Sequence, residues 1–206
     1  MDRAVESPKL PAIAVFDFDG TLTRRDSLMP FLRMAVSRWQ FYWGLLIVSP
    51  VLVGYALKLT PNWRAKEAVL TYFLAGWTEE KLQRLGQRFA LQKLPKLLRP
   101  EAVQRLHWHQ NQGHHTILIS ASLEAYLFPW AKQMGFDQAT GTQLEIQNSR
   151  LTGRILGKNC YGSEKVERLE VLLGDLSQYC IYAYGDSRGD RELLDMANYP
   201  YYRTFE

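Results

Sequence analysis

Cysteine is scarce in this sequence, and so are the signals that direct a protein out of the cytoplasm. Cys160 and Cys180 are the two cysteines among 206 residues, and their spacing matches no zinc site. This excludes a disulfide framework and favours two reduced thiols in a cytosolic protein. The first eleven residues are polar and contain no apolar stretch of the kind found in secretory signals. We therefore expect a cytoplasmic location.

A strong excess of one charge is also lacking. The chain has 25 Lys and Arg against 21 Asp and Glu, and it contains no zinc-finger or RNA-binding signature, so we expect no nucleic-acid partner. The charge is unevenly distributed, however. Residues 24–99 hold 13 Lys and Arg against 4 Asp and Glu, whereas the rest of the chain holds 12 against 17. The basic segment indicates a part of the molecule that faces an anionic substrate or an anionic membrane surface.

The order of apolar runs predicts an α/β fold. Short apolar runs predict strands, and apolar residues at helical spacing predict helices. The strands expected are 12–16, 116–120 and 180–185, with a hairpin turning at Asn148–Ser149; the helices are 79–98, 101–113, 122–135, 191–197 and one that begins at Ser163. Strands and helices that alternate after residue 100 predict a doubly wound, mostly parallel, Rossmann-like sheet. We expect this core to comprise residues 10–24 and 104–206, with an inserted all-helical cap of residues 25–103.

Two carboxylates follow the first predicted strand in "DFDGT". Asp17 and Asp19 are two residues apart, and in an extended chain such residues point the same way. Both can therefore address one point beyond the carboxyl end of the strand, where open α/β sheets bind ligands. Gly20 permits a sharp turn, and Thr21 adds a polar side chain. Two like charges so close together require a cation or a shared proton.

Polar residues also stand where the later elements begin or end. Ser120 ends a second strand, Lys165 lies in the first turn of a helix, and Asp186 and Asp190 follow a third strand. Each alone has an ordinary explanation as a turn, surface or capping residue. Together they bring a hydroxyl, an ammonium and further carboxylates to one edge of the sheet.

The segments "DFDGTLT" (17–23) and "GDSRGD" (185–190), with Ser120 and Lys165 between them, resemble the motifs of the haloacid dehalogenase superfamily of phosphohydrolases. The resemblance spans nearly the whole chain. An all-helical insertion between the first two motifs is similar to that of the subgroup containing phosphoserine phosphatase. Within this subgroup, the sequence looks most like the bacterial branch that includes phosphatidylglycerophosphatase C.

The resemblance implies a role for each acidic residue. Asp17 would be the nucleophile that forms an aspartyl-phosphate, and Asp19 would protonate the leaving alkoxide and then activate water. Mg²⁺ would be held by the Asp17 carboxylate, the Asp19 backbone carbonyl and Asp186. Asp190 would orient Lys165 or a metal-bound water rather than bind the ion itself.

The remaining polar residues would bind the substrate. The resemblance implies that Ser120 and Lys165 hold the phosphoryl oxygens, and we add Thr21 to the substrate-binding residues. Phosphoserine phosphatases carry a glutamate in the helix after the first motif, where this chain has Asp26 in "RRDSL". This difference casts doubt on phosphoserine as the substrate without excluding it.

Residues 39–57 form a run of nineteen uncharged, mostly apolar positions within this basic segment. A helix of that length spans about 28 Å, close to the hydrocarbon thickness of a bilayer. A single crossing is excluded, because Asp17 precedes the run and Ser120, Lys165 and Asp186 follow it. Two alternatives remain: a buried pair of cap helices broken near Ser49–Pro50, or an element that lies on or dips into a membrane. Aromatic residues at both ends and flanking basic residues favour the second.

The sequence therefore predicts a Mg²⁺-dependent phosphomonoester hydrolase at the inner face of the cytoplasmic membrane, with a lipid phosphate such as phosphatidylglycerophosphate as substrate. The main alternative is a small-metabolite phosphatase such as phosphoserine phosphatase. A phosphotransferase and a non-catalytic phosphate-binding protein remain as further alternatives.

Overall fold

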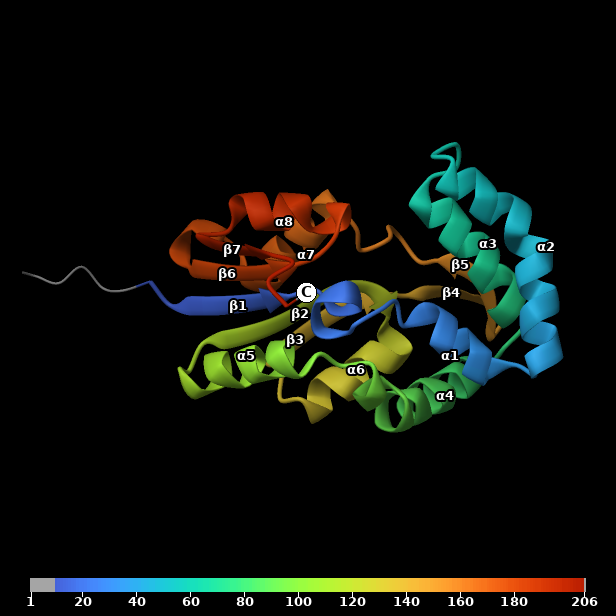
Figure 1. Ribbon diagram of the computed structural model, residues 1–206, viewed down its shortest axis with the longest axis horizontal. Helices are drawn as coiled ribbons and strands as arrows, with labels where there is room; N and C mark the ends of the chain where they lie inside the picture. Colours follow the sequence, from blue (N-terminus) through green and yellow to red (C-terminus); the bar gives the residue numbers. More distant parts are fainter. Residues whose placement is uncertain (1–9, 206) are drawn as a thin grey trace, which may run out of the picture.

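The computed structural model describes residues 10–205 and contains a five-stranded, fully parallel sheet (Figure 1). In spatial order the strands are β3 (Gln138–Thr142), β2 (His115–Leu123), β1 (Ala12–Phe16), β6 (Cys180–Gly185) and β7 (Tyr199–Tyr202). The chain leaves β1 toward β2 and β3 and later returns to the other side of β1 with β6 and β7. This reversal between β1 and β6 is the point at which open α/β sheets bind ligands. The predicted doubly wound fold is confirmed.

Helices cover both faces of this sheet because successive β1 side chains point to opposite sides. Ile13 and Val15 pack on the face covered by α7 (Ser163–Leu173) and α8 (Arg191–Met196). Ala14 and Phe16 pack on the other face, beneath α5 (Pro100–Asn111) and α6 (Glu124–Gln133). In Figure 1 the first pair of helices lies above the strands and the second pair below them. With both faces buried, the carboxyl edge of the sheet is left open to ligands.

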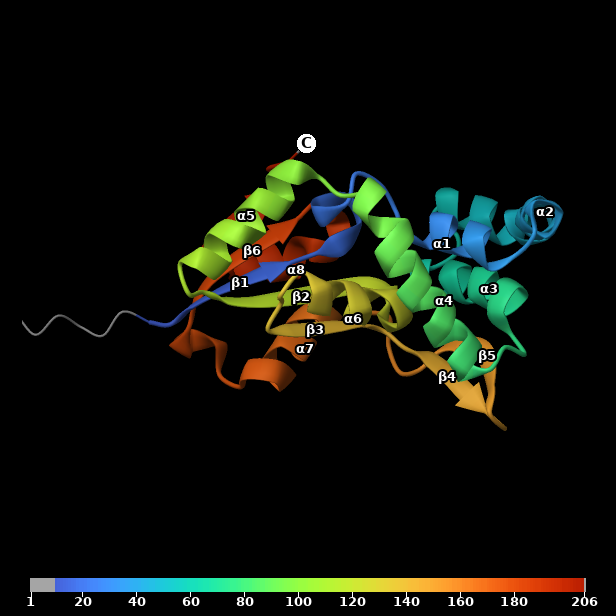
Figure 2. The ribbon, with the colours of Figure 1, turned by 90° about the horizontal axis from the view of Figure 1, so that it is seen from below.

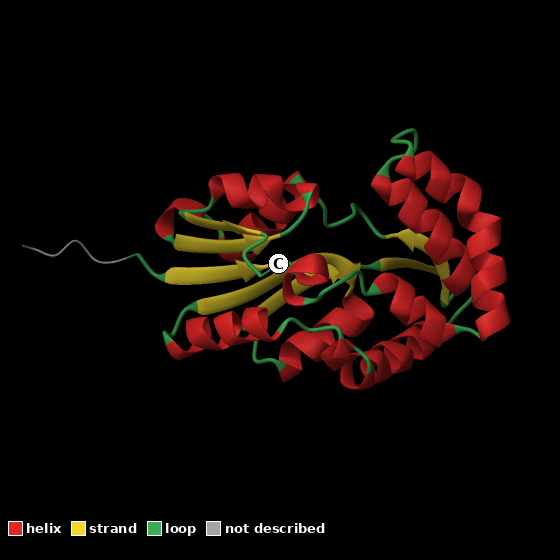
Figure 3. Ribbon diagram, viewed as in Figure 1, coloured by secondary structure: helices red, strands yellow, loops and turns green. Residues whose placement is uncertain are grey.

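Four helices lie between β1 and the core helix α5, and we call them the cap helices. They are α1 (Leu28–Ala35), α2 (Arg38–Ala56), α3 (Asn62–Leu74) and α4 (Glu79–Gln92). Figure 3 shows α2 and α3 at the end of the molecule opposite the sheet. Helix α4 instead runs beside α6 of the core, as Figure 2 shows. At Gly86 the two approach so closely that an added Cβ would lie 2.0 Å from the Ala125 carbonyl oxygen.

The predicted hairpin forms and packs against the cap helices. Strands β4 (Leu144–Gln147) and β5 (Arg150–Ile155) are joined by Asn148 and Ser149, which both have positive φ. Gly153 of β5 lies directly against Thr71 of α3, where an added Cβ would be 2.2 Å from the Thr71 Cα. The hairpin belongs to the sequence range expected in the core, yet its neighbour is α3. The division into core and cap at residues 25 and 103 stays a prediction.

Helix α2 differs from the first of the two alternatives, a buried pair of cap helices broken near Ser49–Pro50. It is one continuous helix, because the Ser49 hydroxyl donates a hydrogen bond of 2.7 Å to the Leu46 carbonyl, whose usual donor is missing at Pro50. Within α2, Phe41, Gly44 and Val48 are buried. Among residues 10–205 it is the one helix long and apolar enough to cross a bilayer, and 17% of its most apolar window is buried.

Candidate active site

A buried ion pair forms the centre of the site. Asp17 directly follows β1, and its backbone N–H donates to the Tyr184 carbonyl of β6 at 2.9 Å, which fixes it at the point where the chain reverses. The Lys165 Nζ lies 2.6 Å from the Asp17 Oδ1 and 2.5 Å from the Asp190 Oδ1. All three side chains are buried. The structure thus brings together residues 148 and 25 positions apart in the sequence.

Asp190 acts on this centre through its neighbours. One oxygen contacts Lys165, and the other accepts hydrogen bonds from the Ser187 hydroxyl at 2.8 Å and from the N–H groups of Ser187 and Asp186 at 2.9 and 3.2 Å. Both carboxylate oxygens are therefore engaged. Asp190 was expected to orient Lys165 or a metal-bound water, and that role stays a prediction; the structure shows one of its oxygens on Lys165 and the other on the loop of Asp186 and Ser187.

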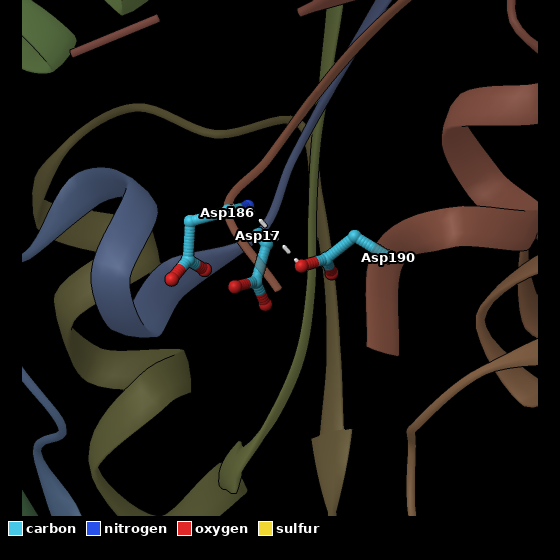
Figure 4. Close-up of side chains that lie close together, drawn as sticks. All are labelled: Asp17, Asp186 and Asp190. Atoms are coloured by element: carbon cyan, nitrogen blue, oxygen red, sulfur yellow. Dashed lines mark hydrogen bonds between the residues drawn. The ribbon is translucent and has the colours of Figure 1, made fainter. Parts of the chain in front are cut away.

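A third carboxylate completes an acidic cluster. Asp17, Asp186 and Asp190 each have an oxygen within 4.8 Å of the others, and Figure 4 shows the Asp17 and Asp186 carboxyl groups pointing to the same side. Gly20, with φ of +86°, makes room for Asp186: an added Cβ would lie 2.1 Å from its Oδ2. Thr21 lies beside this cluster, with its hydroxyl 3.5 Å from the Asp186 Oδ1.

These residues fit a divalent cation of the Mg²⁺ type. Three carboxylates meet one ammonium, so negative charge exceeds positive charge in a largely buried place, and carboxylate oxygens are the ligands that Mg²⁺ prefers. Asp17 and Asp186 would hold the ion, because both Asp190 oxygens have other partners.

The Asp19 carboxyl lies among a group of hydroxyls and lines the same cavity as Asp17 and Asp186. Its Oδ2 accepts hydrogen bonds from the Ser122 hydroxyl at 2.6 Å and the Ser27 hydroxyl at 3.1 Å, and its Oδ1 accepts from the Ser27 N–H at 2.8 Å. The Tyr126 hydroxyl lies 3.0 Å from the Ser27 hydroxyl. With its carboxylate held in this way, Asp19 could offer a cation its backbone carbonyl but not its side chain.

The site residues Ser27 and Ser122 were not identified from the sequence. Ser122 lies two positions after Ser120 on β2, so the alternation that pairs Asp17 with Asp19 could have placed it on the same side. Ser27 carried no comparable signal. It reaches Asp19 because the chain turns between Thr23, whose N–H bonds back to the Phe18 carbonyl at 3.0 Å, and the start of α1.

Burial shifts the acid–base properties of both motif carboxyls. It raises the pKa of Asp17 to about 8, with the Lys165 ammonium acting against the rise and Asp190 adding to it. It raises the pKa of Asp19 to about 7, with the charge of Asp26 adding and hydrogen bonds from Ser122 and Ser27 opposing. A carboxyl with a pKa near 7 is suited both to donating and to accepting a proton at neutral pH.

Lys165 and Asp190 stabilise each other as charged groups. For Asp190, burial alone would raise the pKa, but the Lys165 charge and hydrogen bonds from Lys165 and Ser187 outweigh it, so the pKa is lowered. For Lys165, burial alone would lower the pKa, but the charges of Asp17 and Asp190 outweigh it, so the pKa is raised. Lys165 is therefore a permanent cation at the site.

A cavity of about 470 Å³ opens above these groups, between the core and the cap helices. Asp17, Asp19, Ser120, Lys165 and Asp186 all line it. Ser120 is buried, and its hydroxyl accepts a hydrogen bond of 3.1 Å from the Ser122 N–H. Thr21 and Asp190 lie behind the residues that line the cavity. Five of the seven predicted site residues thus face one space.

The walls of the cavity differ in character. The cap side contributes apolar side chains from α1, α2 and α3, namely Leu28, Met29, Leu52, Ala65 and Val69. Arg24, Arg25 and Asp26 also line it, and the Asp26 carboxylate accepts from the N–H groups of Leu28 and Met29 at 2.9 and 3.3 Å. Asp26 therefore caps the start of α1, which leaves it less free to contact a substrate amine.

Comparison with known proteins connects this geometry to a family. The family model of the haloacid dehalogenase-like hydrolases matches residues 14–195. The CicA protein of Caulobacter vibrioides is 36% identical over 197 residues, covering 95% of this chain and 87% of that protein. Proteins named as phosphatases also match, at 26 and 31% identity.

Solved structures show the same fold. A protein of unknown function from Bordetella pertussis Tohama I superposes with a TM-score of 0.80 at 25% identity, covering 93% of this chain and 89% of that one. A substrate-bound phosphoserine phosphatase gives a TM-score of 0.62 at 17% identity, covering 93% and 84%.

The chain belongs to the haloacid dehalogenase-like hydrolases. It is a phosphatase of this family, and its fold is shared with solved phosphoserine phosphatases. The resemblance to the haloacid dehalogenase superfamily inferred from the motifs is confirmed, and so is the expectation of an enzyme.

Proposed function

We propose that this enzyme is a Mg²⁺-dependent phosphomonoesterase that works through an aspartyl-phosphate on Asp17. The observation that carries the proposal is the Asp17–Lys165 contact of 2.6 Å at the floor of the cavity, with Asp186 beside it. A carboxylate oxygen of Asp17 attacks phosphorus, and the bond between phosphorus and the alcohol oxygen breaks. Lys165 and Ser120 hold the phosphoryl oxygens during this transfer. Bound by Asp17 and Asp186, Mg²⁺ would neutralise negative charge on the phosphoryl group.

Asp19 transfers a proton in each half of the reaction, the formation and the hydrolysis of the aspartyl-phosphate. It gives its proton to the departing alkoxide and is left as a carboxylate. The carboxylate then takes a proton from a water molecule that attacks phosphorus, the bond between phosphorus and Asp17 breaks, and inorganic phosphate leaves. Hydrogen bonds from Ser27 and Ser122 keep the Asp19 carboxyl oriented in both protonation states.

The test of this mechanism is the Asp17→Asn variant with p-nitrophenyl phosphate. We expect turnover, and rapid labelling of the protein by a radioactive phosphomonoester, to be lost while the circular dichroism spectrum stays unchanged. Wild-type turnover in the variant would refute the role of Asp17. If the wild-type enzyme formed a phosphorylated acceptor alcohol instead of inorganic phosphate, a phosphotransferase would be favoured.

For the substrate, we propose a lipid phosphate such as phosphatidylglycerophosphate. The apolar cap wall supports a substrate whose alcohol part is apolar beyond the phosphate. Leu52 and Tyr55 of α2 line the cavity, and the same helix exposes a set of large apolar side chains, comprising Trp39, Tyr42, Trp43, Leu46, Ile47 and Val53. The cavity and this exposed apolar face of α2 are thus adjacent. A phosphoester whose tail lies in lipid could therefore present its headgroup to Asp17.

The exposed apolar face supports peripheral contact with an anionic membrane. Trp39 is 78% exposed and Trp43 is 60% exposed, and soluble monomers seldom leave so many large apolar groups together in water. The exposed side chains of Arg38 and Lys58 flank the two ends of α2 and would meet lipid headgroups. The helix does not cross the bilayer, because residues before and after it form one site.

A flotation experiment with anionic liposomes tests this contact. We expect the wild type to float at low salt, and the double variant Trp39→Ser, Trp43→Ser to stay in solution with unchanged turnover of p-nitrophenyl phosphate. Val171→Ser is the matched control, because Val171 is 85% exposed but lies on α7 of the core. Failure of the wild type to float would count against the lipid substrate.

The alternative substrate is a small metabolite such as phosphoserine. It is supported by the likeness of the fold to phosphoserine phosphatases and by the position of Asp26 at the cavity. The two are distinguished by kcat/KM for phosphatidylglycerophosphate in mixed micelles and for phosphoserine. A higher value for phosphoserine would overturn the lipid assignment and leave the aspartyl-phosphate mechanism intact.

A further inference from the structure

The Lys66 side chain of α3 reaches from the cap helices into the core beside the active site. Its Nζ donates hydrogen bonds to the Ala121 carbonyl, to the Thr142 hydroxyl at 2.9 Å and to the Asn159 side-chain oxygen at 2.8 Å. An ammonium has three N–H donors, so Lys66 is fully satisfied by neutral core acceptors. A second bond from the same helix, between the Asn159 amide and the Asn62 side-chain oxygen at 2.9 Å, supports this contact.

The peptide between Ala121 and Ser122 is held at both ends. Its carbonyl accepts from Lys66 and from Thr142, and its N–H donates to the Ser120 hydroxyl at 3.1 Å. The Ser122 hydroxyl in turn donates to the Asp19 Oδ2 at 2.6 Å. One peptide therefore separates the cap ammonium from the hydroxyl that orients Asp19.

We propose that Lys66 is a positioning residue that makes proton donation by Asp19 depend on the seating of α3 against the core. When α3 is seated, Lys66 fixes the Ala121–Ser122 peptide and Ser122 holds the Asp19 carboxyl toward the leaving group. When α3 lifts, the peptide keeps its bond from Thr142 but loses the one from Lys66, and the hold of Ser122 on Asp19, one of its two orienting partners, is weakened. The inference rests on the proposed role of Asp19 and adds a dependence on the cap that the mechanism itself does not require.

Two substrates of nearly equal size separate this role from a general structural one. p-Nitrophenyl phosphate releases a phenolate that leaves without protonation, whereas 4-nitrobenzyl phosphate releases an alkoxide that needs a proton from Asp19. General acid catalysis contributes about 10²–10⁴ in rate, so partial loss of orientation should cost roughly tenfold or more with the benzyl ester alone. A structural defect would lower kcat/KM for both esters equally.

The experiment compares Lys66→Met with Lys66→Arg and Arg88→Met. We expect Lys66→Met to lower the ratio of benzyl to phenyl kcat/KM by about tenfold or more, and Lys66→Arg, which keeps N–H donors, to restore part of it. Arg88 is an exposed cation of the cap helix α4, so Arg88→Met should leave the ratio unchanged. If Lys66→Met does not fold, Asn159→Leu takes its place. It removes one acceptor of Lys66 and should also lower the ratio of benzyl to phenyl kcat/KM.

A double variant tests whether Lys66 acts through Ser122. Ser122→Ala should lower the ratio by itself, and adding Lys66→Met should lower it no further, because both changes remove the same connection. Equal losses of kcat/KM with both esters in Lys66→Met, or losses that multiply in the double variant, would overturn this inference. If Asp17→Asn is inactive in the same assays, the proposed function still stands. Wild-type turnover in Asp17→Asn would overturn the proposed function, and this inference with it.

Discussion

Replacing Lys165 with methionine keeps the length of the side chain and removes the charge between two buried carboxylates. The Nζ is 2.6 Å from Asp17 and 2.5 Å from Asp190, and the lysine side chain is 3% exposed. Removing one partner of a buried ion pair costs about 3–5 kcal/mol in the free energy of unfolding, because the remaining charges stay buried. We expect a loss of this size near neutral pH, measured by urea unfolding.

Lys165→Met should also lose most of its catalytic activity, for reasons separate from its lower stability. Removing one donor to the reacting oxygens costs about 10²–10³ in kcat. The pKa of Asp17 is already raised to about 8 by burial and would rise further without the ammonium. At a given pH below the pKa of Asp17, each further unit of rise in that pKa lowers the ionised fraction of Asp17 about tenfold. Turnover of p-nitrophenyl phosphate should therefore fall by about 10³ or more.

The pH dependence gives this prediction its sharpest test. In the variant, Asp17 and Asp190 would have folded-state pKa values above the unfolded value of 3.8, so the variant should gain stability as the pH falls through those values. In the wild type the pKa of Asp17 is raised as well, so below about pH 8 the contribution of Asp17 is common to both proteins. Lys165 lowers the pKa of Asp190 in the wild type, so the contribution of Asp190 to wild-type stability is lost only as the pH falls below 3.8. The gap in unfolding free energy between the two proteins should therefore narrow as the pH falls from neutral through the raised pKa of Asp190 in the variant toward 3.8.

Lys158→Met is the matched control for this experiment. Lys158 is exposed on the loop before α7 and pairs with Glu167 at 2.8 Å and Glu164 at 3.5 Å. Its removal should leave turnover and the pH dependence of unfolding unchanged. Near-wild-type turnover in Lys165→Met, or a stability gap that does not vary with pH, would refute the reasoning.

Two further predictions concern the acidic cluster. Gly20→Ala should require a much higher Mg²⁺ concentration for half-maximal activity, because the new Cβ would displace the Asp186 carboxylate. The φ of +86° would add about 1–2 kcal/mol of backbone strain. An unchanged Mg²⁺ titration would contradict this prediction. Mg²⁺ binding near pH 7 should release protons, because the pKa of Asp17 is about 8 and the bound ion requires the ionised carboxyl. Calorimetry in two buffers of different ionisation enthalpy measures this release, which should decline above about pH 8, and its absence at neutral pH would show that Asp17 is ionised before the metal binds.

The central strands could be predicted from the sequence because their residues are buried on both faces. The apolar run 12–16 and the run 180–185 correspond to β1 and β6, which have neighbours on both sides. Strands β3 (Gln138–Thr142) and β7 (Tyr199–Tyr202) were not predicted. They form the two edges of the sheet, where polar residues, glycine and proline are tolerated, so their sequences lack the apolar pattern of a buried strand.

The carboxylates of the site could be predicted better than the hydroxyls around Asp19, because the carboxylates lie at the ends of strands. Asp17, Asp186 and Ser120 follow or end strands, and parallel strands bring their carboxyl ends to one edge whatever the loops do. Ser27 depends on how the chain turns before α1, which no local pattern specifies. The continuous course of α2 also escaped prediction, because proline usually interrupts a helix and the compensating bond from Ser49 to Leu46 is visible only in three dimensions.

The two halves of the site are therefore supported by different parts of the chain. Asp17, Lys165, Asp186 and Asp190 are joined to one another within the core, so the nucleophile stays in place whatever the cap helices do. Asp19 instead depends on Ser27 at the start of α1 and, through Ser122, on Lys66 of α3. On the proposed mechanism, an open cap would leave the nucleophile in place but weaken the proton donor. Alkyl phosphates would then react only after the cap has closed and excluded bulk water, which favours completion of the transfer once it has begun.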